Sequence, residues 1–191
     1  VLIVLPVSAY FSLQSPAVQT WVSNRIAGYF SSEWGTTVRV EGVDIEFFSK
    51  LVLEGVYVED QHRDTLLYAG KLKADIRLFD RDSARIFVDD VTLQDATIKL
   101  KWYNGDSALN FQFIADEFAS SDTTPSTDST QWDVRIGGVT LDNIRFVYKI
   151  ESDTAQLKGI NFSDLLAHNV SGRITDISFD ADTTHCIIER L

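Results

Sequence analysis

The chain has 191 residues, of which 45% are hydrophobic, and its formal net charge is −11. This length and composition fit one medium-sized folded domain or two small ones. The acidic balance argues against nucleic-acid binding, which needs surplus Lys and Arg to neutralise phosphates, and against a domain resting broadly on anionic lipid. Cys186 is the only cysteine, which excludes an intramolecular disulfide and a cysteine-based metal cluster.

The first eleven residues, VLIVLPVSAYF, carry no charge. A membrane-spanning helix needs about 20 mostly apolar residues, so this stretch is too short as it stands. Because methionine is absent, the chain does not begin at a natural initiator, and we interpret residues 1–14 as the outer end of a transmembrane signal anchor. The alternatives are an apolar core segment or a signal-peptide remnant. The residues expected in the anchor and at its interface are Val1, Leu2, Ile3, Val4, Leu5, Tyr10 and Phe11.

An amphipathic helix is predicted over residues 15–35. Ser15 is a suitable N-cap, Pro16 fits the first helical position and Gly35 fits the end. Such a helix could lie on a bilayer, but we expect it to close one end of the core that follows. Its apolar stripe, with spacings of three and four, consists of Val18, Trp21, Val22, Ile26, Tyr29 and Phe30.

From residue 36 to residue 191 the hydrophobic period changes from 3.6 to 2. Repeated alternation of apolar and polar residues is typical of strands with one dry face and one wet face, and it favours a mostly antiparallel sheet. The sequence therefore predicts a mainly β protein. The apolar face is expected to contain Val38, Val40, Ile45, Leu51, Leu53, Val56, Val58, Leu72, Ile76, Leu78, Val91, Leu93, Ile98, Leu100, Leu141, Ile144 and Phe146.

Three stretches repeat one irregularity: LVLEGVYV from Leu51, VTLQDATIKL from Val91 and VTLDNIRFVY from Val139. In each, the apolar set slips by one residue across a pair of the Gly/Asp/Asn/Glu/Gln type. A strand that continued unchanged would send its later apolar side chains to the wrong face. A β-bulge or a very tight corner at the slip would keep them on one side and bend the sheet. We therefore expect long, curved strands with all apolar side chains on one face.

The three copies are 40 and then 48 residues apart, and the second interval contains the Ser/Thr/Asp-rich segment 119–131, predicted to be an exposed loop. Without that loop the spacings are nearly equal, which favours an extended β structure built from repeats. Residues 109–118 alternate and are predicted as a further strand. Residues 159–172 are expected to form a helical turn or an irregular return.

Catalytic or metal-binding patterns are not found in the sequence. His62, His168 and His185 lack partners at metal-ligand spacing, and we expect surface positions for them. The paired carboxylates Glu59–Asp60 and Asp89–Asp90 are interpreted as solvated strand corners. No enzyme activity, cofactor or metal is therefore predicted.

The block SPAVQTWVSNRIAGYFSSEWGTTVRV, followed by LVLEGVYVEDQHRDTLLYAGKL and the later VTLQDATIKL, resembles the start of the TamB branch of the AsmA-like proteins of bacteria with two membranes. The likeness covers Ser15 to about Phe118 and continues weakly through the repeats to Tyr148. It rests on the ordered set of segments, because no single motif is diagnostic.

The resemblance implies a single-pass inner-membrane anchor and a long periplasmic β-groove. It implies passive transfer of phospholipid acyl chains toward the outer membrane, and a TamA-like outer-membrane barrel partner met through a C-terminal domain beyond this chain. Lipid chains would need a continuous apolar lining to leave water.

Two other functions remain compatible with the sequence. The β-region could be an assembly module for insertion or secretion of outer-membrane proteins, acting through an exposed strand edge. It could also be a binding domain on a membrane stalk that acts through the 119–131 loop.

Overall fold

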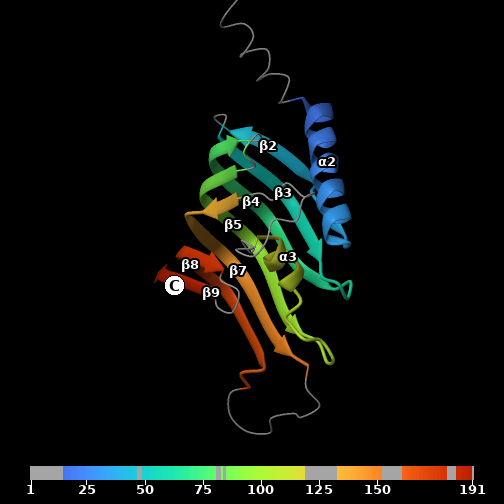
Figure 1. Cartoon of the computed structure of the whole chain (residues 1–191), viewed down its shortest axis with the longest axis vertical. Helices are drawn as coiled ribbons and strands as arrows, with labels where there is room; N and C mark the ends of the chain where they lie inside the picture. Colours follow the sequence, from blue (N-terminus) through green and yellow to red (C-terminus); the bar gives the residue numbers. More distant parts are fainter. Residues whose placement is uncertain are drawn as a thin grey trace, which may run out of the picture.

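A single open, curved sheet of nine strands dominates the part of the chain that the structure describes (Figure 1). The computed structural model describes residues 15–46, 49–80, 83, 85–118, 133–151, 161–179 and 184–190. The mainly β class is confirmed. The anchor predicted for residues 1–14 and the loop 119–131 lie outside the described residues. Of the two described helices, neither is long and apolar enough to cross a bilayer.

The first helix is α2 (Pro16–Trp34). The strands in chain order are β1 (Val38–Arg39), β2 (Gly42–Glu46), β3 (Lys50–Glu59), β4 (Thr65–Asp80), β5 (Arg85–Trp102), β6 (Asp133–Ile136), β7 (Gly138–Ile150), β8 (Asp164–Phe179) and β9 (Thr184–Arg190), with α3 (Gln112–Phe118) between β5 and β6. Their order across the sheet is β1-β3-β4-β5-β7-β8-β9, with β2 beside β3 and β6 beside β5.

The helix α2 begins and ends where its sequence predicts. Ser15 is extended at the N-cap position, and its carbonyl accepts the first helical hydrogen bond from Gln19 N at 3.0 Å. Gly35 has φ +63° and ends the helix in the left-handed conformation that glycine adopts without strain. The predicted helix over residues 15–35 is therefore confirmed.

The sheet is mixed, and its antiparallel pairs agree with the mostly antiparallel sheet that the sequence favoured. Most described neighbours are antiparallel, but β5 pairs in parallel with both β6 and β7. Parallel neighbours need a long connection to return the chain to the same end of the sheet. The connection between β5 and β6, which includes α3, provides it. As a result, two of the repeated stretches lie side by side in register, with Val91 opposite Val139 and Leu93 opposite Leu141.

The repeated slip is a corner that neighbouring strands share. From β3 to β4 the partners are Glu54–Lys71 before the slip and Val56–Ala69 after it, so no residue is inserted relative to the partner. The register is likewise unchanged through the slip between β4 and β5 and between β5 and β7. Of the two alternatives predicted, a bulge or a tight corner, these pairs form the corner.

Left-handed residues produce the corner. Gly55, Asp95, Asn143 and Asn169 have φ between +50° and +59°, and they lie at the slips of β3, β5, β7 and β8. Asn and Asp adopt this conformation more readily than other non-glycine residues. Asn143 Nδ2 also donates a hydrogen bond of 2.6 Å to Asp95 Oδ1 on the neighbouring strand. One line of left-handed residues thus bends several strands at the same level.

A true bulge occurs upstream, in the Val88–Val91 segment. Asp75 of β4 pairs with Asp90, but the next residue, Ile76, pairs with Val88, so Asp89 is an extra residue. Gly137 lies against this bulge and donates its N–H to Val88 O at 2.9 Å. A Cβ at position 137 would lie 2.7 Å from Asp89 O, so only glycine fits there.

Two predictions of secondary structure were wrong. Residues 109–118 contain α3 and not a strand, because a short apolar run such as Phe111, Phe113 and Ile114 fits both periods. Residues 159–172 contain the first half of β8 and not an irregular return. In β8 the alternation of apolar and polar residues changes phase at Asn169. Because the neighbouring His168 and Ala167 are not large apolar residues, the hydrophobicity pattern did not reveal the strand.

The corner predicts a difference between two substitutions of Asn143. Asn143→Val places a β-branched side chain at φ +56° and removes the hydrogen bond to Asp95, so we expect a loss of about 2–3 kcal/mol in the free energy of unfolding. Asn143→Gly tolerates the angle and should lose only about 1 kcal/mol. Urea unfolding measures both. Equal losses would contradict a requirement for the left-handed conformation.

Candidate functional site

The candidate site is the inner face of the sheet, defined here by four cross-strand rows of mainly apolar residues. The first row is Val38, Val58, Leu67, Ile98, Phe146 and Ala167. The second is Val56, Ala69, Ala96, Ile144 and Val170. Beyond the corner, the third is Val43, Leu53, Leu72, Leu93, Leu141 and Gly172. The fourth is Ile45, Leu51, Ala74, Val91, Val139, Ile174 and Ile188.

The corner lies between the second and third rows, and it does not divide the inner face. Leu53 and Val56, on either side of the slip in β3, belong to one hydrophobic cluster, and so do Ala69 and Leu72 in β4. Ala69 and Ala96 are 0% and 2% exposed, which shows how closely the backbone packs at the corner. Close packing at the corner requires small side chains at these two positions. They are absent from the predicted lining because that prediction selected mainly large apolar residues.

Most of the predicted lining residues belong to this cluster. They are Val38, Val40, Leu51, Leu53, Val56, Val58, Leu72, Leu93, Ile98, Leu100, Leu141 and Ile144. Among the described residues the cluster does not include the remaining five, which are Ile45, Ile76, Leu78, Val91 and Phe146. All five are half-buried. Ile76 pairs with Val88 and Leu78 with Phe87, at the end of β4 beyond the fourth row.

Two helices cover part of the inner face. Val22, Ile26, Phe30 and Trp34 of α2 pack against the cluster, as the predicted role in closing one end of the core requires. The segment that contains α3 adds Phe111, Phe113 and Ile114. The rings of Trp34 and Phe113 meet edge to face, with centroids 6.1 Å apart (Figure 1 shows α3 in front of the sheet). Sequence reasoning missed these three residues because it predicted a strand there.

The predicted stripe on α2 is only partly buried. Val22, Ile26 and Phe30 pack inward, but Trp21 and Tyr29 are 66% and 55% exposed. Val18 is half-buried and is not one of the residues that pack on the cluster. The helix therefore presents a second apolar surface on the side away from the sheet.

A buried carboxylate holds the connection that carries α3. Asp60 is fully buried, which corrects the expectation of a solvated Glu59–Asp60 corner. Its Oδ2 accepts hydrogen bonds from Tyr103 Oη at 2.8 Å and Asn110 Nδ2 at 2.9 Å. Its Oδ1 accepts bonds of 2.9 Å from the backbone N–H groups of His62 and Asp64. These bonds tie the segment before α3 to the β3–β4 hairpin and so position α3 over the inner face.

Charged groups surround this junction. Asp64 accepts hydrogen bonds from Lys101 and, at 3.2 Å, from Lys99, and both lysines come from β5. Partial burial by itself would raise the pKa of Asp64, but the bonds from Lys101, the Thr65 N–H and Lys99 outweigh it and lower the pKa from 3.8 to about 2. Burial and the hydrogen bond to Asp60 raise the pKa of Tyr103, so its hydroxyl remains a donor.

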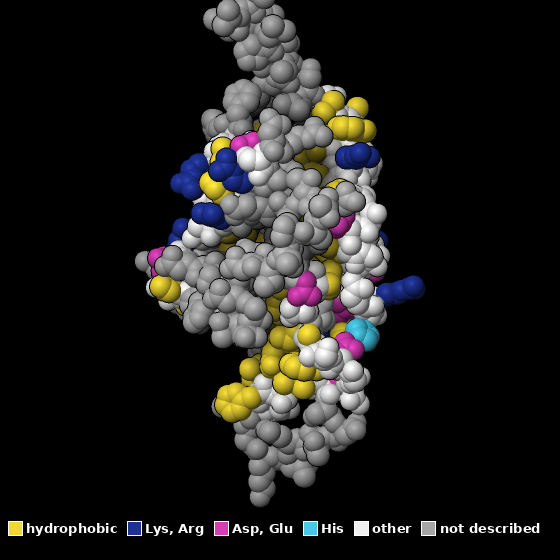
Figure 2. Space-filling view, viewed as in Figure 1, with side chains coloured by type: hydrophobic (Ala, Val, Ile, Leu, Met, Phe, Trp, Pro, Cys, Tyr) yellow, Lys and Arg dark blue, Asp and Glu magenta, His cyan; other side chains and the backbone are white. Residues whose placement is uncertain are grey.

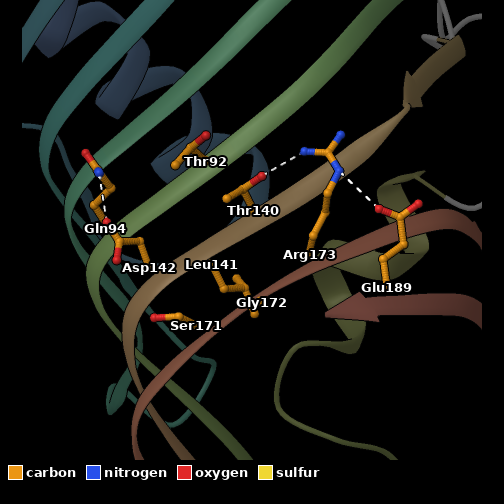
Figure 3. Close-up of a pocket in the computed structure, with 9 residues that line it drawn as sticks. All are labelled: Thr92, Gln94, Thr140, Leu141, Asp142, Ser171, Gly172, Arg173 and Glu189. Carbon is orange, nitrogen blue, oxygen red and sulfur yellow. Dashed lines mark hydrogen bonds and ion pairs between the residues drawn. The ribbon is translucent and has the colours of Figure 1, made fainter. Parts of the chain in front are cut away.

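The outer face of the sheet contains a polar hollow of about 680 Å³ over β5, β7, β8 and β9 (Figure 3). Arg173 NH1 is 2.7 Å from Asp90 Oδ1 and donates to Thr140 Oγ1 at 3.0 Å, and Arg173 Nε is 3.5 Å from Glu189 Oε2. Gln94 donates to Asp142 at 3.1 Å. Because carboxylates already surround the guanidinium, this hollow favours neither an anion nor an apolar ligand.

The other titratable groups of the described residues lack the arrangement that a metal site needs. Within the described ranges, no three His, Cys, Asp or Glu side chains gather as metal ligands would. His62 stacks on Tyr103 with ring centroids 3.9 Å apart, and its Nε2 lies 2.8 Å from Asp106 Oδ2. No protein-family model, curated protein or solved structure matches the chain significantly. The apolar inner face of the sheet is therefore the candidate functional site.

The Asp60 junction predicts a compensating pair of substitutions. Asp60→Asn presents a donor to Asn110 Nδ2 in place of an acceptor, and we expect it to lower the free energy of unfolding by about 2–3 kcal/mol. Adding Asn110→Asp reverses the donor and the acceptor and should restore part of the loss. Urea unfolding of the two single variants and the double variant completes the cycle. Strictly additive losses would contradict a direct bond.

The pKa of Asp64 predicts a change in acid sensitivity. The folded chain favours the ionised form of Asp64, so this carboxylate stabilises the fold fully at pH values above 3.8, its pKa in the unfolded chain. The stabilisation disappears as the pH falls toward about 2, its pKa in the folded chain. Between pH 5 and pH 2, the urea midpoint of Asp64→Asn should therefore fall less steeply than that of the parent. Adding Lys101→Gln to Asp64→Asn should change the slope no further. A parental slope in Asp64→Asn would contradict this role.

Proposed function

We propose that this chain is the membrane-proximal part of a conduit for phospholipid acyl chains, and that it acts without catalysis or a cofactor. The observation that carries the proposal is the inner face, whose rows remain apolar from strand to strand and on both sides of the corner. A guest of this kind needs apolar contact along its length and no fixed polar partner.

The dimensions of the inner face suit an acyl chain. The fourth row crosses seven strands, from Ile45 on β2 to Ile188 on β9. At about 4.8 Å between neighbouring strands, that row is roughly 29 Å long. One leaflet of a bilayer has a hydrocarbon depth of about 15 Å, so the row exceeds the depth that a chain occupies there. Each methylene moved from water onto this surface contributes about 0.8 kcal/mol.

The two ends of the inner face differ in a way that supports a trough with one closed end. At the β1 and β2 end, α2 packs on the cluster, and the segment that carries α3 adds further apolar side chains, so this part of the inner face is a core. Toward β8 and β9 the rows continue through Ile174 to Ile188, which is 56% exposed. We therefore assign the guest to the fourth row around Val91, Val139 and Ile174, rather than to the covered surface near Val56.

The resemblance to the TamB branch extends the proposal to the cell. The chain would be a single-pass protein of the inner membrane, anchored by residues 1–14, with its β-region in the periplasm. It would take part in outer-membrane biogenesis by carrying phospholipid between the inner and outer membranes. A TamA-like outer-membrane barrel would be met through a region beyond this chain.

A second candidate function is an assembly scaffold for outer-membrane protein insertion or secretion. The observation that favours it is β9, the last strand in the sheet order, where Ile187 and Ile188 are 53% and 56% exposed. An exposed edge with apolar side chains is a template for β-augmentation. In this function a client strand pairs with β9, and the inner face serves only as a core.

Photo-crosslinking at matched positions tests the conduit. A photoreactive residue at Val91 or Leu141 on the inner face should give phospholipid adducts when the full chain is expressed in a two-membrane bacterium. The same residue at the outer-face neighbours Thr92 and Thr140 should give none, because adjacent residues of a strand point to opposite faces. Mass spectrometry of the purified protein identifies the adducts.

The controls separate the two functions. Equal lipid labelling at inner and outer positions, or none at either inner position while protein crosslinks form efficiently, would contradict the conduit. Ile187→Pro removes a backbone donor from β9, so it should abolish client-strand capture if the scaffold function is correct. Under the conduit it should leave the Val91 and Leu141 adducts in place.

A further inference from the structure

The outer side of α2 carries two exposed aromatic residues, Trp21 and Tyr29, of which Tyr29 also meets the ring of Phe30 edge to face with centroids 5.2 Å apart. At 100° per residue, Trp21 and Gly28 lie on the side of the helix roughly opposite Ile26 and Phe30, which pack on the sheet. Arg25 and Tyr29 follow on the same exposed sector, and Tyr29 lies at its border with the packed residue Val22. Trp21 and Tyr29 are 66% and 55% exposed. Figure 2 shows hydrophobic and basic side chains together on the surface at the upper end of α2.

We propose that this sector of α2 lies on the interfacial region of a phospholipid bilayer, so that the helix contacts the sheet with one face and the membrane with the other. The inference does not depend on lipid carriage by the inner face, since it concerns a different surface. It also differs from the anchor expected in residues 1–14, because it assigns membrane contact to named side chains of a folded helix.

The chemistry of the sector fits a bilayer interface. Trp and Tyr concentrate at that depth because each has an apolar ring and a polar group that can remain hydrated. Arg25 lies between them and can reach a headgroup phosphate, a contact worth about 1 kcal/mol near an anionic surface. The only other charged residue of α2 is Glu33, at the far end of the helix.

Several observations favour a bilayer over a protein partner or a second copy. The sector is short, and at Gly28 an added Cβ would meet nothing within 4 Å, so the surface there is open and carries no side chain that a protein partner could contact. The stretch VLIVLPVSAYF, uncharged throughout, precedes the helix by only four residues. The net charge of −11 opposes broad contact with anionic lipid, which limits the contact to this one face.

Site-specific fluorescence tests the proposal in the full chain. In a Cys186→Ser background, Gly28→Cys carries an NBD dye in the middle of the sector, and Asp142→Cys carries it on the exposed outer face of the sheet. Vesicles of phosphatidylcholine and phosphatidylglycerol at 3:1 are added. We expect a blue shift and a fall of at least threefold in iodide quenching at position 28, with neither change at position 142.

A variant separates the sector from the N-terminal segment. Trp21→Ser with Tyr29→Ser should abolish the change at position 28 even if flotation shows that the protein still binds vesicles through residues 1–14. Replacing the exposed Phe162 by Ser is the matched control and should leave the change intact. Circular dichroism confirms that α2 remains helical in each variant.

Two results would overturn the proposal. One is unchanged iodide quenching at position 28 in vesicle-bound protein. The other is protection of position 28 without vesicles that increases with protein concentration, which would assign the sector to contact between two copies of the chain.

Discussion

A β-strand sends successive side chains to opposite faces, and this period of two is the constraint on which the rest of the structure depends. A sharply bent strand must change the phase of its alternation or lose its apolar face at the bend. Here one left-handed residue in each of β3, β5, β7 and β8 makes that change at a common level. The bend and the continuity of the apolar face therefore have one cause.

The helices and the buried carboxylate follow from that inner face. Most apolar side chains of the curved sheet lie on its inner face, and α2 and the segment that carries α3 cover part of them. The covering depends on Asp60, which ties Asn110 and Tyr103 to the β3–β4 hairpin and thereby positions Phe113 against Trp34. Polar contacts at one hairpin thus decide how much of the inner face the α3 segment covers.

The sequence was most informative where a local pattern has one physical cause. Ser15, Pro16 and Gly35 predicted the ends of α2, and the slips at Gly55, Asp95 and Asn143 predicted a bulge or a tight corner at those positions. It was least informative where partners are distant in the chain. The alternation of Phe111 and Phe113 did not reveal a helix, because only contact with Trp34 distinguishes the two periods.

Long-range pairing explains the other differences. Nothing near Asp60 in the chain indicates that Asn110 will bury it, so the pair Glu59–Asp60 was indistinguishable from a solvated corner. The parallel pairing of β5 and β7 joins residues far apart in the chain, such as Val91 and Val139, and strand patterns do not specify it. The outward Trp21 and Tyr29 fitted the helical stripe, and only the direction of packing separates them from Ile26 and Phe30.

Cysteine scanning through the corner of β5 is the most direct test of the central claim, that the slip keeps the apolar residues on one face. In a Cys186→Ser background, single cysteines at positions 91 to 98 are reacted with a small polar maleimide under native conditions. The account predicts slow reaction at 91, 93, 96 and 98 and faster reaction at 92, 94, 95 and 97, with the change of phase at Asp95. Unbroken alternation, with 91, 93, 95 and 97 slow, would contradict it.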